Sequence, residues 1–96
     1  MYMYSFEWDE IKNTANFKKH KVWFEEAQKC FSDPNLRVFF DDDHSEDEDR
    51  FLAIGFSEPG RLLIVSHTSN EEEEIIRIIS ARKAIKKERE YYEKRV

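Results

Sequence analysis

The chain has 96 residues, a formal net charge of −5 and a single cysteine. This length fits one domain spanning residues 1–96, and a lone cysteine excludes an intrachain disulfide framework and suits a reducing cytoplasm. The N-terminus lacks a signal-peptide pattern, and no apolar run approaches the roughly 18–20 residues of a membrane span. We therefore predict a cytoplasmic protein with no membrane partner.

The charges are unevenly distributed along the chain. Residues 41–49 hold seven carboxylates, and residues 71–74 are four glutamates. Residues 18–21 and the segment from Arg77 to the end are instead basic. Such a chain can present a cationic face to nucleic acid despite its negative net charge. Ordinary solvated surface explains the same charges, so both readings stay open.

In chain order, the first expected element is a strand over residues 4–8, where aromatic residues alternate with small or acidic ones. Asp9 is a suitable N-cap for a helix over residues 10–20, with Ile11, Ala15 and Phe17 or Lys18 on its inner side. A second short helix follows over residues 22–31. Strands are predicted over 36–40, 50–57 and 61–69, and the turn at 58–60 joins the last two into an antiparallel hairpin.

The stretch "IIRIISARKA", residues 75–84, is ambiguous between strand and helix. Its β-branched residues favour a strand over 75–80, and Ser80 is a good N-cap for a final helix. Arg77 then lies on a sheet face and Arg82 lies in the first helical turn. Together the elements predict the α+β class, with a small antiparallel sheet flanked by helices.

Two arginines beside a helix N-terminus can bind a phosphate group. The alternative is structural, because a partly buried arginine needs a carboxylate partner. For Arg77 that partner is expected to be a residue such as Glu48 or Asp49 on a neighbouring element.

Four stretches in order resemble the BrnT-type toxins, ribonucleases of bacterial type II toxin–antitoxin modules. They are "FEWDEIKNTANFKKHKVWFEEA" (6–27), "DHSEDEDRFLAIG" (43–55), "RLLIVSHT" (61–68) and "IRIISARKA" (76–84). The resemblance implies an α+β fold similar to RelE-type toxins and cleavage of mRNA. It also implies a cognate antitoxin with a ribbon-helix-helix DNA-binding domain. Operator DNA would be contacted only through that antitoxin.

Cleavage of RNA through its own 2′-hydroxyl needs a base, an acid and cations, and it requires no metal or cofactor. His20, in a basic cluster at the end of the first predicted helix, is the first candidate for acid or base, although it could instead cap that helix. His67 ranks second, since a lone strand histidine is more often structural, and His44 ranks last. Arg77 and Arg82 are the expected phosphate clamp, and Lys12 or Lys19 could add charge for RNA binding.

The acidic loop lacks the glycine and the glutamate of a calcium-binding loop, so no metal site is predicted. The competing function is a non-catalytic module that only docks an antitoxin as a co-repressor partner. Convergence of His20 and the two arginines on one cleft favours the enzyme, whereas scattering over several faces favours the module.

Overall fold

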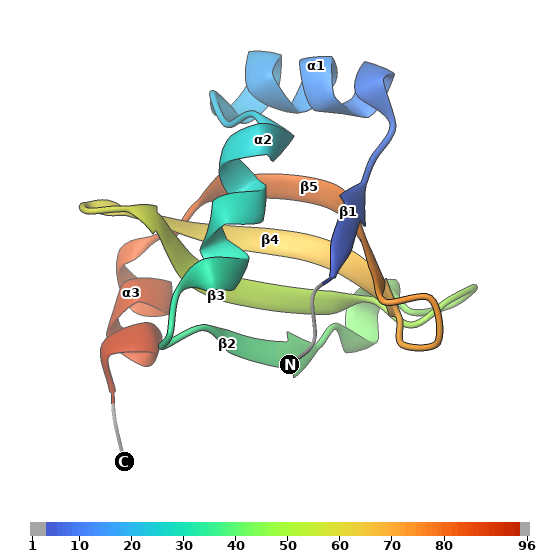
Figure 1. Ribbon diagram of the computed structural model, residues 1–96. Helices are drawn as coiled ribbons and strands as arrows, with labels where there is room; N and C mark the ends of the chain where they lie inside the picture. Colours follow the sequence, from blue (N-terminus) through green and yellow to red (C-terminus); the bar gives the residue numbers. More distant parts are fainter. Residues whose placement is uncertain (1–3, 95–96) are drawn as a thin grey trace.

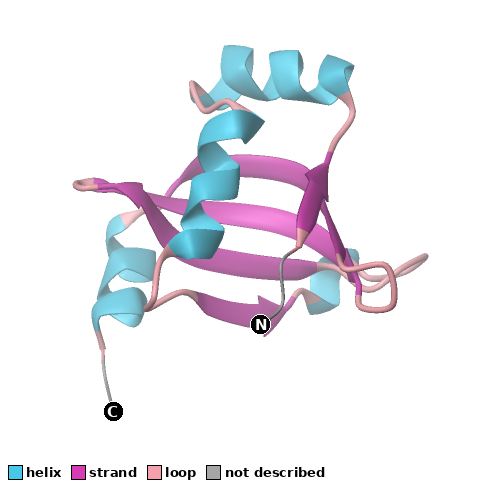
Figure 2. Ribbon diagram, viewed as in Figure 1, coloured by secondary structure: helices cyan, strands magenta, loops and turns pink. Residues whose placement is uncertain are grey.

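The computed structural model describes residues 4–94, which form a five-stranded sheet with helices on both faces (Figures 1 and 2). None of the helices in this range is long and apolar enough to cross a membrane. The strands are β1 (Ser5–Glu7), β2 (Arg37–Phe40), β3 (Phe51–Glu58), β4 (Arg61–Asn70) and β5 (Ile75–Lys83). The helices are α1 (Glu10–His20), α2 (Phe24–Ala27) and α3 (Lys86–Glu93), with 3-10 helices η1 (Gln28–Ser32) and η2 (Asp42–His44).

The sheet order is β1-β5-β4-β3-β2, and the four strands from β2 to β5 pair antiparallel. At the opposite edge, β1 pairs parallel with β5 through Ser5–Glu7 and residues 75–77. The predicted α+β class and the β3–β4 hairpin are confirmed. The sheet is mixed rather than wholly antiparallel, because the N-terminal strand joins the free edge of β5 instead of a sequence neighbour.

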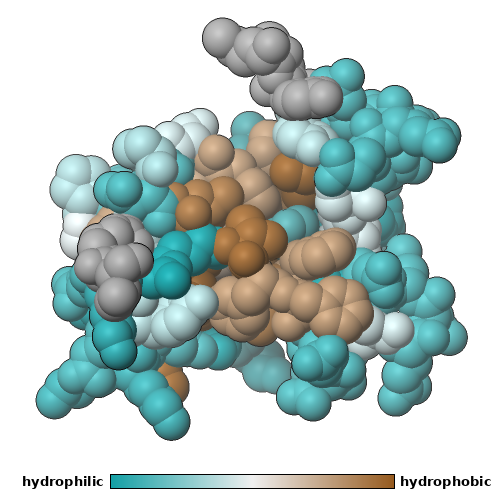
Figure 3. Space-filling view, turned by 90° about the horizontal axis from the view of Figure 1, so that it is seen from below, coloured by the Kyte–Doolittle hydropathy of each residue, from teal (hydrophilic) through white to brown (hydrophobic). Residues whose placement is uncertain are grey.

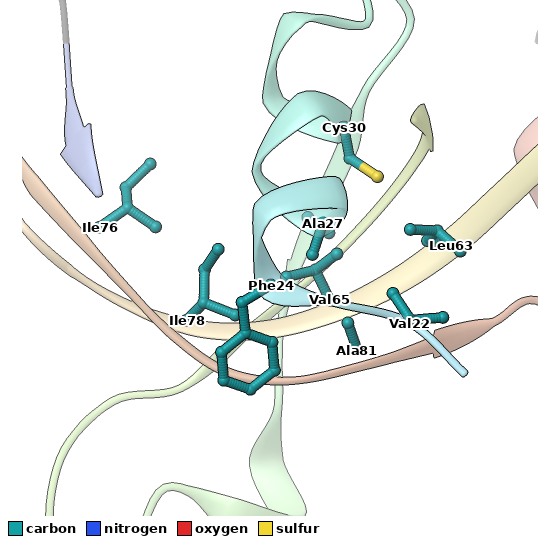
Figure 4. Packing of buried hydrophobic residues seen from close by; sticks show 10 residues of the cluster. Val22, Phe24, Ala27, Cys30, Leu63, Val65, Ile76, Ile78 and Ala81 are labelled. Carbon is teal, nitrogen blue, oxygen red and sulfur yellow. The ribbon is translucent and has the colours of Figure 1, made fainter. Parts of the chain in front are cut away.

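Two apolar clusters hold the layers together, one on each face of the sheet. On one face, Phe24, Ala27 and Cys30 of α2 and η1 pack over Val65 and Ile78 (Figure 4). On the other face, Tyr92 of α3 packs over strand residues, namely Ile54, Leu62 and Ile64. Cys30 is buried in the core, and this burial raises the pKa of its thiol to about 12.

The last strand is longer than predicted. β5 runs to Lys83, which pairs with Leu63, so Ser80 is a strand residue and not an N-cap. The reason is that β4 spans ten residues and offers partners well beyond Ser80. The final helix begins at Lys86, and Arg82 therefore lies in a strand and not in a first helical turn.

A β-bulge in β5 decides which face each of its side chains occupies. Ile78 pairs with His67 and Ser80 pairs with Ser66, so Ile79 is an extra residue. In a regular strand, side chains alternate between the two faces of the sheet, so Arg77 and Arg82, five residues apart, would lie on opposite faces. The extra residue Ile79 shifts this alternation by one, and both arginines therefore lie on the same face.

The inner side of α1 is polar, which contradicts our sequence interpretation. Ile11 is 82% exposed and Ala15 is also exposed, whereas the buried residues are Asn13 and Asn16. The periodicity of apolar residues failed here because this helix contacts the rest of the molecule through hydrogen bonds.

Asn16 joins α1 to the edge of β5. Its side-chain Nδ2 donates to the carbonyl oxygens of Ala81 and Val22, both at 2.8 Å, and its Oδ1 accepts from the Ala81 N–H at 3.1 Å. β1 covers only residues 75–77 of this edge, so the amide of Asn16 satisfies backbone groups that a neighbouring strand would otherwise bond.

We predict that Asn16→Leu lowers the free energy of unfolding by roughly 2–4 kcal/mol, because it leaves buried backbone groups at Ala81 and Val22 without partners. Urea unfolding would measure this change. Thr14→Leu introduces the same side chain at an exposed position of α1 and is expected to change stability by less than about 0.5 kcal/mol. Equal stability of the two variants would contradict the role given to Asn16.

Candidate active site

A cleft of about 420 Å³ lies on the sheet face that also carries α3, next to the C-terminal end of α1. It collects polar side chains from segments far apart in the sequence. The charged and titratable lining residues are His20, Asp41, Asp43, His44, Arg50 and Arg82.

Strand register builds the floor of this cleft. Leu52, Ser66 and Ser80 form one row across β3, β4 and β5, and the next row on the same face holds Ile64 beside Arg82. The floor therefore combines apolar side chains with two hydroxyl groups, and a guanidinium stands at one end of it.

Arg82 is held by Glu88 of α3. Its Nη1 and Nη2 donate to Glu88 Oε1 and Oε2 at 2.8 and 2.7 Å, a bidentate pair. The hydrogen bonds from Arg82 lower the pKa of Glu88 below its ordinary 4.5, against the opposing effect of burial. Glu88 Oε1 also accepts from the Ile85 N–H at 2.9 Å, so the start of α3 fixes the orientation of the arginine.

His20 reaches the cleft as the last residue of α1, and it is half-buried. Lys21 follows in the left-handed conformation, with φ of 61°, and its N–H closes the helix by donating to the Phe17 carbonyl. Asn16 lies one helical turn before His20 and is bonded to Ala81, the residue preceding Arg82. This contact brings the histidine and the arginine into the same cleft.

Two further residues line the cleft that our sequence analysis either missed or ranked last. Arg50 is half-buried, and within residues 4–94 its guanidinium has no hydrogen-bonding or ion-pair partner. His44 Nδ1 lies 3.0 Å from Asp41 Oδ2. The acidic composition of residues 41–49 obscured both residues, since this loop reads as solvated surface in the sequence.

A family model described as "Ribonuclease toxin, BrnT, of type II toxin-antitoxin system" matches residues 8–88. The chain belongs to this family. It is therefore a ribonuclease toxin of a type II toxin–antitoxin system, with RNA as substrate and an antitoxin as partner. No curated protein sequence matched the chain.

The fold is similar to a crystal structure of the Brucella abortus ribonuclease toxin BrnT, at 1.1 Å resolution. The two chains share 24% sequence identity, and the match covers 88% of this chain and 100% of the other, with a TM-score of 0.66. At this identity the likeness supports the fold, and the family model carries the assignment to the BrnT toxins.

Arg77 does not line the cleft of this BrnT-family chain. It lies on the same sheet face, but its Nη1 donates to Glu7 Oε2 at 2.9 Å in a separate hollow of about 710 Å³. That hollow is acidic, since Glu48, Asp49 and residues 71–73 also line it. Arg77 therefore fits the expectation of an arginine paired with a carboxylate better than that of a phosphate-binding residue. Its partner, however, is Glu7 and not Glu48 or Asp49.

His67 lies on the opposite face of the sheet and is 4% exposed. Its ring packs edge-on against Phe31 at 5.0 Å, and its Nδ1 lies 3.2 Å from the Val65 carbonyl oxygen. Burial lowers the pKa of this ring. The residue lines a hollow of about 750 Å³ that is mainly apolar and is not lined by any of the cleft residues.

The outer part of this opposite face is apolar as well. Val38 and Phe40 of the edge strand β2 are partly exposed on this face, whereas Phe39 pairs with Leu52 on the face of α3 and packs against Tyr91. Figure 3 looks at the molecule from below, and apolar side chains gather near the centre of that side. The two hollows therefore differ in character: the one on the face of His67 is mainly apolar, and the cleft on the face of α3 contains side chains of both charges.

Lys12 and Lys19 are exposed on α1 and do not line the cleft. Lys19 directly precedes His20, whereas Lys12 lies about 12 Å away along the helix axis at the usual helical rise. Of these two lysines, Lys19 is therefore the nearer to His20.

The Arg82–Glu88 pair makes stability depend on pH. Because the folded-state pKa of Glu88 is lowered, its contribution is present above its ordinary value of 4.5 and is lost as the pH falls through the lowered value. We expect Glu88→Gln to flatten the acid limb of stability as the pH falls below 4.5, by less than about 1 kcal/mol because the pair is partly exposed. Glu90→Gln on the exposed side of α3 is the control, and equal acid limbs in the two variants would contradict this account.

Proposed function

We propose that this cleft cleaves mRNA through the 2′-hydroxyl of the substrate, without a metal ion. The observation that carries the proposal is that His20 of α1, Arg50 of the loop before β3 and Arg82 of β5 line one cleft. The imidazole moves a proton, and the two guanidiniums bind the scissile phosphate and the charge that builds on it in the transition state. Side chains of this chain therefore supply the groups that the reaction needs.

The two arginines have different parts in this proposal. Arg82 is oriented by Glu88, which also neutralises part of its charge, so it acts as a fixed donor. Arg50 has no carboxylate partner in the described part of the chain, so its charge is available to an anionic ligand. Arg77 and His67 are not included, because neither lines the cleft: Arg77 is paired with Glu7 in a separate hollow, and His67 is buried on the opposite face of the sheet.

The alternative function, a module that only docks an antitoxin, is less well supported. This alternative predicts that His20, Arg77 and Arg82 are scattered over several faces of the molecule. Arg77 does lie apart, but His20 and Arg82 share one cleft, and the family consists of ribonuclease toxins. The convergence therefore favours the enzyme.

For the partner, we propose an antitoxin with a ribbon-helix-helix domain that contacts operator DNA itself and inhibits the toxin. An acidic segment of this antitoxin binds the basic surface formed by α1 and α3, and so excludes RNA. Lys86 and Lys87 on α3 and Lys18 and Lys19 on α1 are exposed and basic, which supports this arrangement.

We expect Arg82→Ala and His20→Ala each to slow RNA cleavage by roughly 100-fold or more. Arg82→Lys is expected to restore little activity, since lysine lacks the planar fork that pairs with Glu88 and with phosphate. RNA cleavage and thermal unfolding would be measured on the same samples.

Arg77→Ala is the matched control, because it removes an ion-paired arginine from the same strand outside the cleft. It is expected to cleave RNA at the parental rate per folded molecule. A folded Arg82→Ala or His20→Ala protein that cleaves RNA at the parental rate would contradict the proposed site.

For the antitoxin, Lys86→Glu and Lys87→Glu together are expected to weaken the complex at least tenfold at low salt, and added salt is expected to weaken the parental complex. Lys29→Glu in η1 makes the same change of charge per residue away from this surface. Titration of the isolated antitoxin into each variant would measure the affinities. Indifference to both salt and charge reversal would refute the proposed docking surface.

A further inference from the structure

The 2′-hydroxyl reaction proposed above needs two proton-transfer groups, and the cleft contains two histidines, His20 and His44. We propose that His44 is the general base for the 2′-hydroxyl, with Asp41 as its positioning residue, and that His20 is the general acid. This inference rests on the proposed function and goes further, because it gives each histidine a separate role.

The contact with Asp41 determines the tautomer of His44. A carboxylate can only accept a hydrogen bond, so the 3.0 Å contact requires the proton of a neutral ring to lie on Nδ1. The Nε2 lone pair is then free to accept the proton of a hydroxyl group. The same arrangement of carboxylate and imidazole orients the base in nucleophilic triads.

Asp41 is itself held in place. Its side chain is 11% exposed, and its Oδ1 accepts from the Asp43 N–H at 3.2 Å. Its backbone N–H donates to the Arg50 carbonyl at 2.8 Å, and the Ser45 hydroxyl donates to its carbonyl at 2.6 Å. The ring of His44, by contrast, is 65% exposed, so a fixed carboxylate orients an imidazole that substrate can reach.

A structural reading of the same contact is that His44 only helps to close the acidic loop. Three observations distinguish His44 from an ordinary surface histidine. It lines the same cleft as His20, the cleft also contains Arg50 and Arg82, and the partner of its ring is a nearly buried carboxylate. Closing the loop would not by itself require the imidazole to line the cleft.

The proposed step conserves protons and electron pairs. His44 Nε2 takes the proton of the 2′-hydroxyl as the 2′-oxygen attacks phosphorus, while Arg50 and Arg82 bind the phosphate oxygens. The bond from phosphorus to the 5′-oxygen breaks, and His20 gives its proton to that oxygen. The products are a 2′,3′-cyclic phosphate and a 5′-hydroxyl, and exchange with water returns both histidines to their starting states.

The first test uses His44→Ala, Asp41→Asn and the control Asp42→Asn. Asp42 carries the same charge in the same loop, is exposed, and does not line the cleft. We expect His44→Ala to slow cleavage roughly 100-fold or more, with little change in thermal unfolding. Asp41→Asn is expected to approach the same rate, because its amide can donate to Nδ1 and so favours the tautomer with a proton on Nε2. Asp42→Asn is expected to cleave at the parental rate.

The second test separates the base from the acid. Once the cleavage site of the parental enzyme is mapped on a transcript, an RNA oligonucleotide is made with sulfur in place of the bridging 5′-oxygen at that site. A thiolate leaves without being protonated, so this substrate bypasses the general acid. We expect it to restore cleavage by His20→Ala to near the parental rate and to leave His44→Ala slow.

The outcomes separate this inference from the proposed function. If His20→Ala and Arg82→Ala lose cleavage while a folded His44→Ala protein retains it, the cleft is the active site and the role of His44 is wrong. If the sulfur substrate rescues His44→Ala and not His20→Ala, the assigned base is overturned. If none of these variants loses activity, the proposed site itself fails.

Discussion

The amide of Asn16 is the contact on which the geometry of the cleft depends. β1 covers only residues 75–77 of the β5 edge, and the amide takes over hydrogen bonding to the backbone at Ala81. Because these backbone groups are buried, leaving them without partners would cost more than any single surface contact gains. The last turn of α1 is therefore fixed against β5, and His20 is brought to the strand that carries Arg82.

The bulge at Ile79 is the second constraint. It lets β5 contribute Ile78 and Ala81 to one core while Arg77, Ser80 and Arg82 share the other face. The two arginines then differ through their partners. Glu7 holds Arg77 beside an acidic hollow, and Glu88 holds Arg82 at the end of the cleft.

The net charge of the chain does not predict the character of the cleft, because the carboxylates lie in different places and make different contacts. Residues 71–73 line the hollow around Arg77 and do not line the cleft. Glu88 orients an arginine, and Asp41 contacts a histidine. In the proposed site these two carboxylates fix the geometry of a cation and of an imidazole, whereas a carboxylate in open solvent would repel phosphate.

The sequence by itself determined the α+β class, the β3–β4 hairpin and the family, because hydrophobic periodicity, turn residues and ordered motifs are local signals. It also proposed His20 and Arg82 as site residues, and both line the cleft. Only the tertiary structure decided that α1 docks through Asn13 and Asn16, that β5 runs to Lys83, and that Arg50 and His44 join the cleft in place of Arg77 and His67. The physical reason is that these outcomes depend on hydrogen bonds and strand register between segments as far apart as Asn16 and Ala81, which no local pattern encodes.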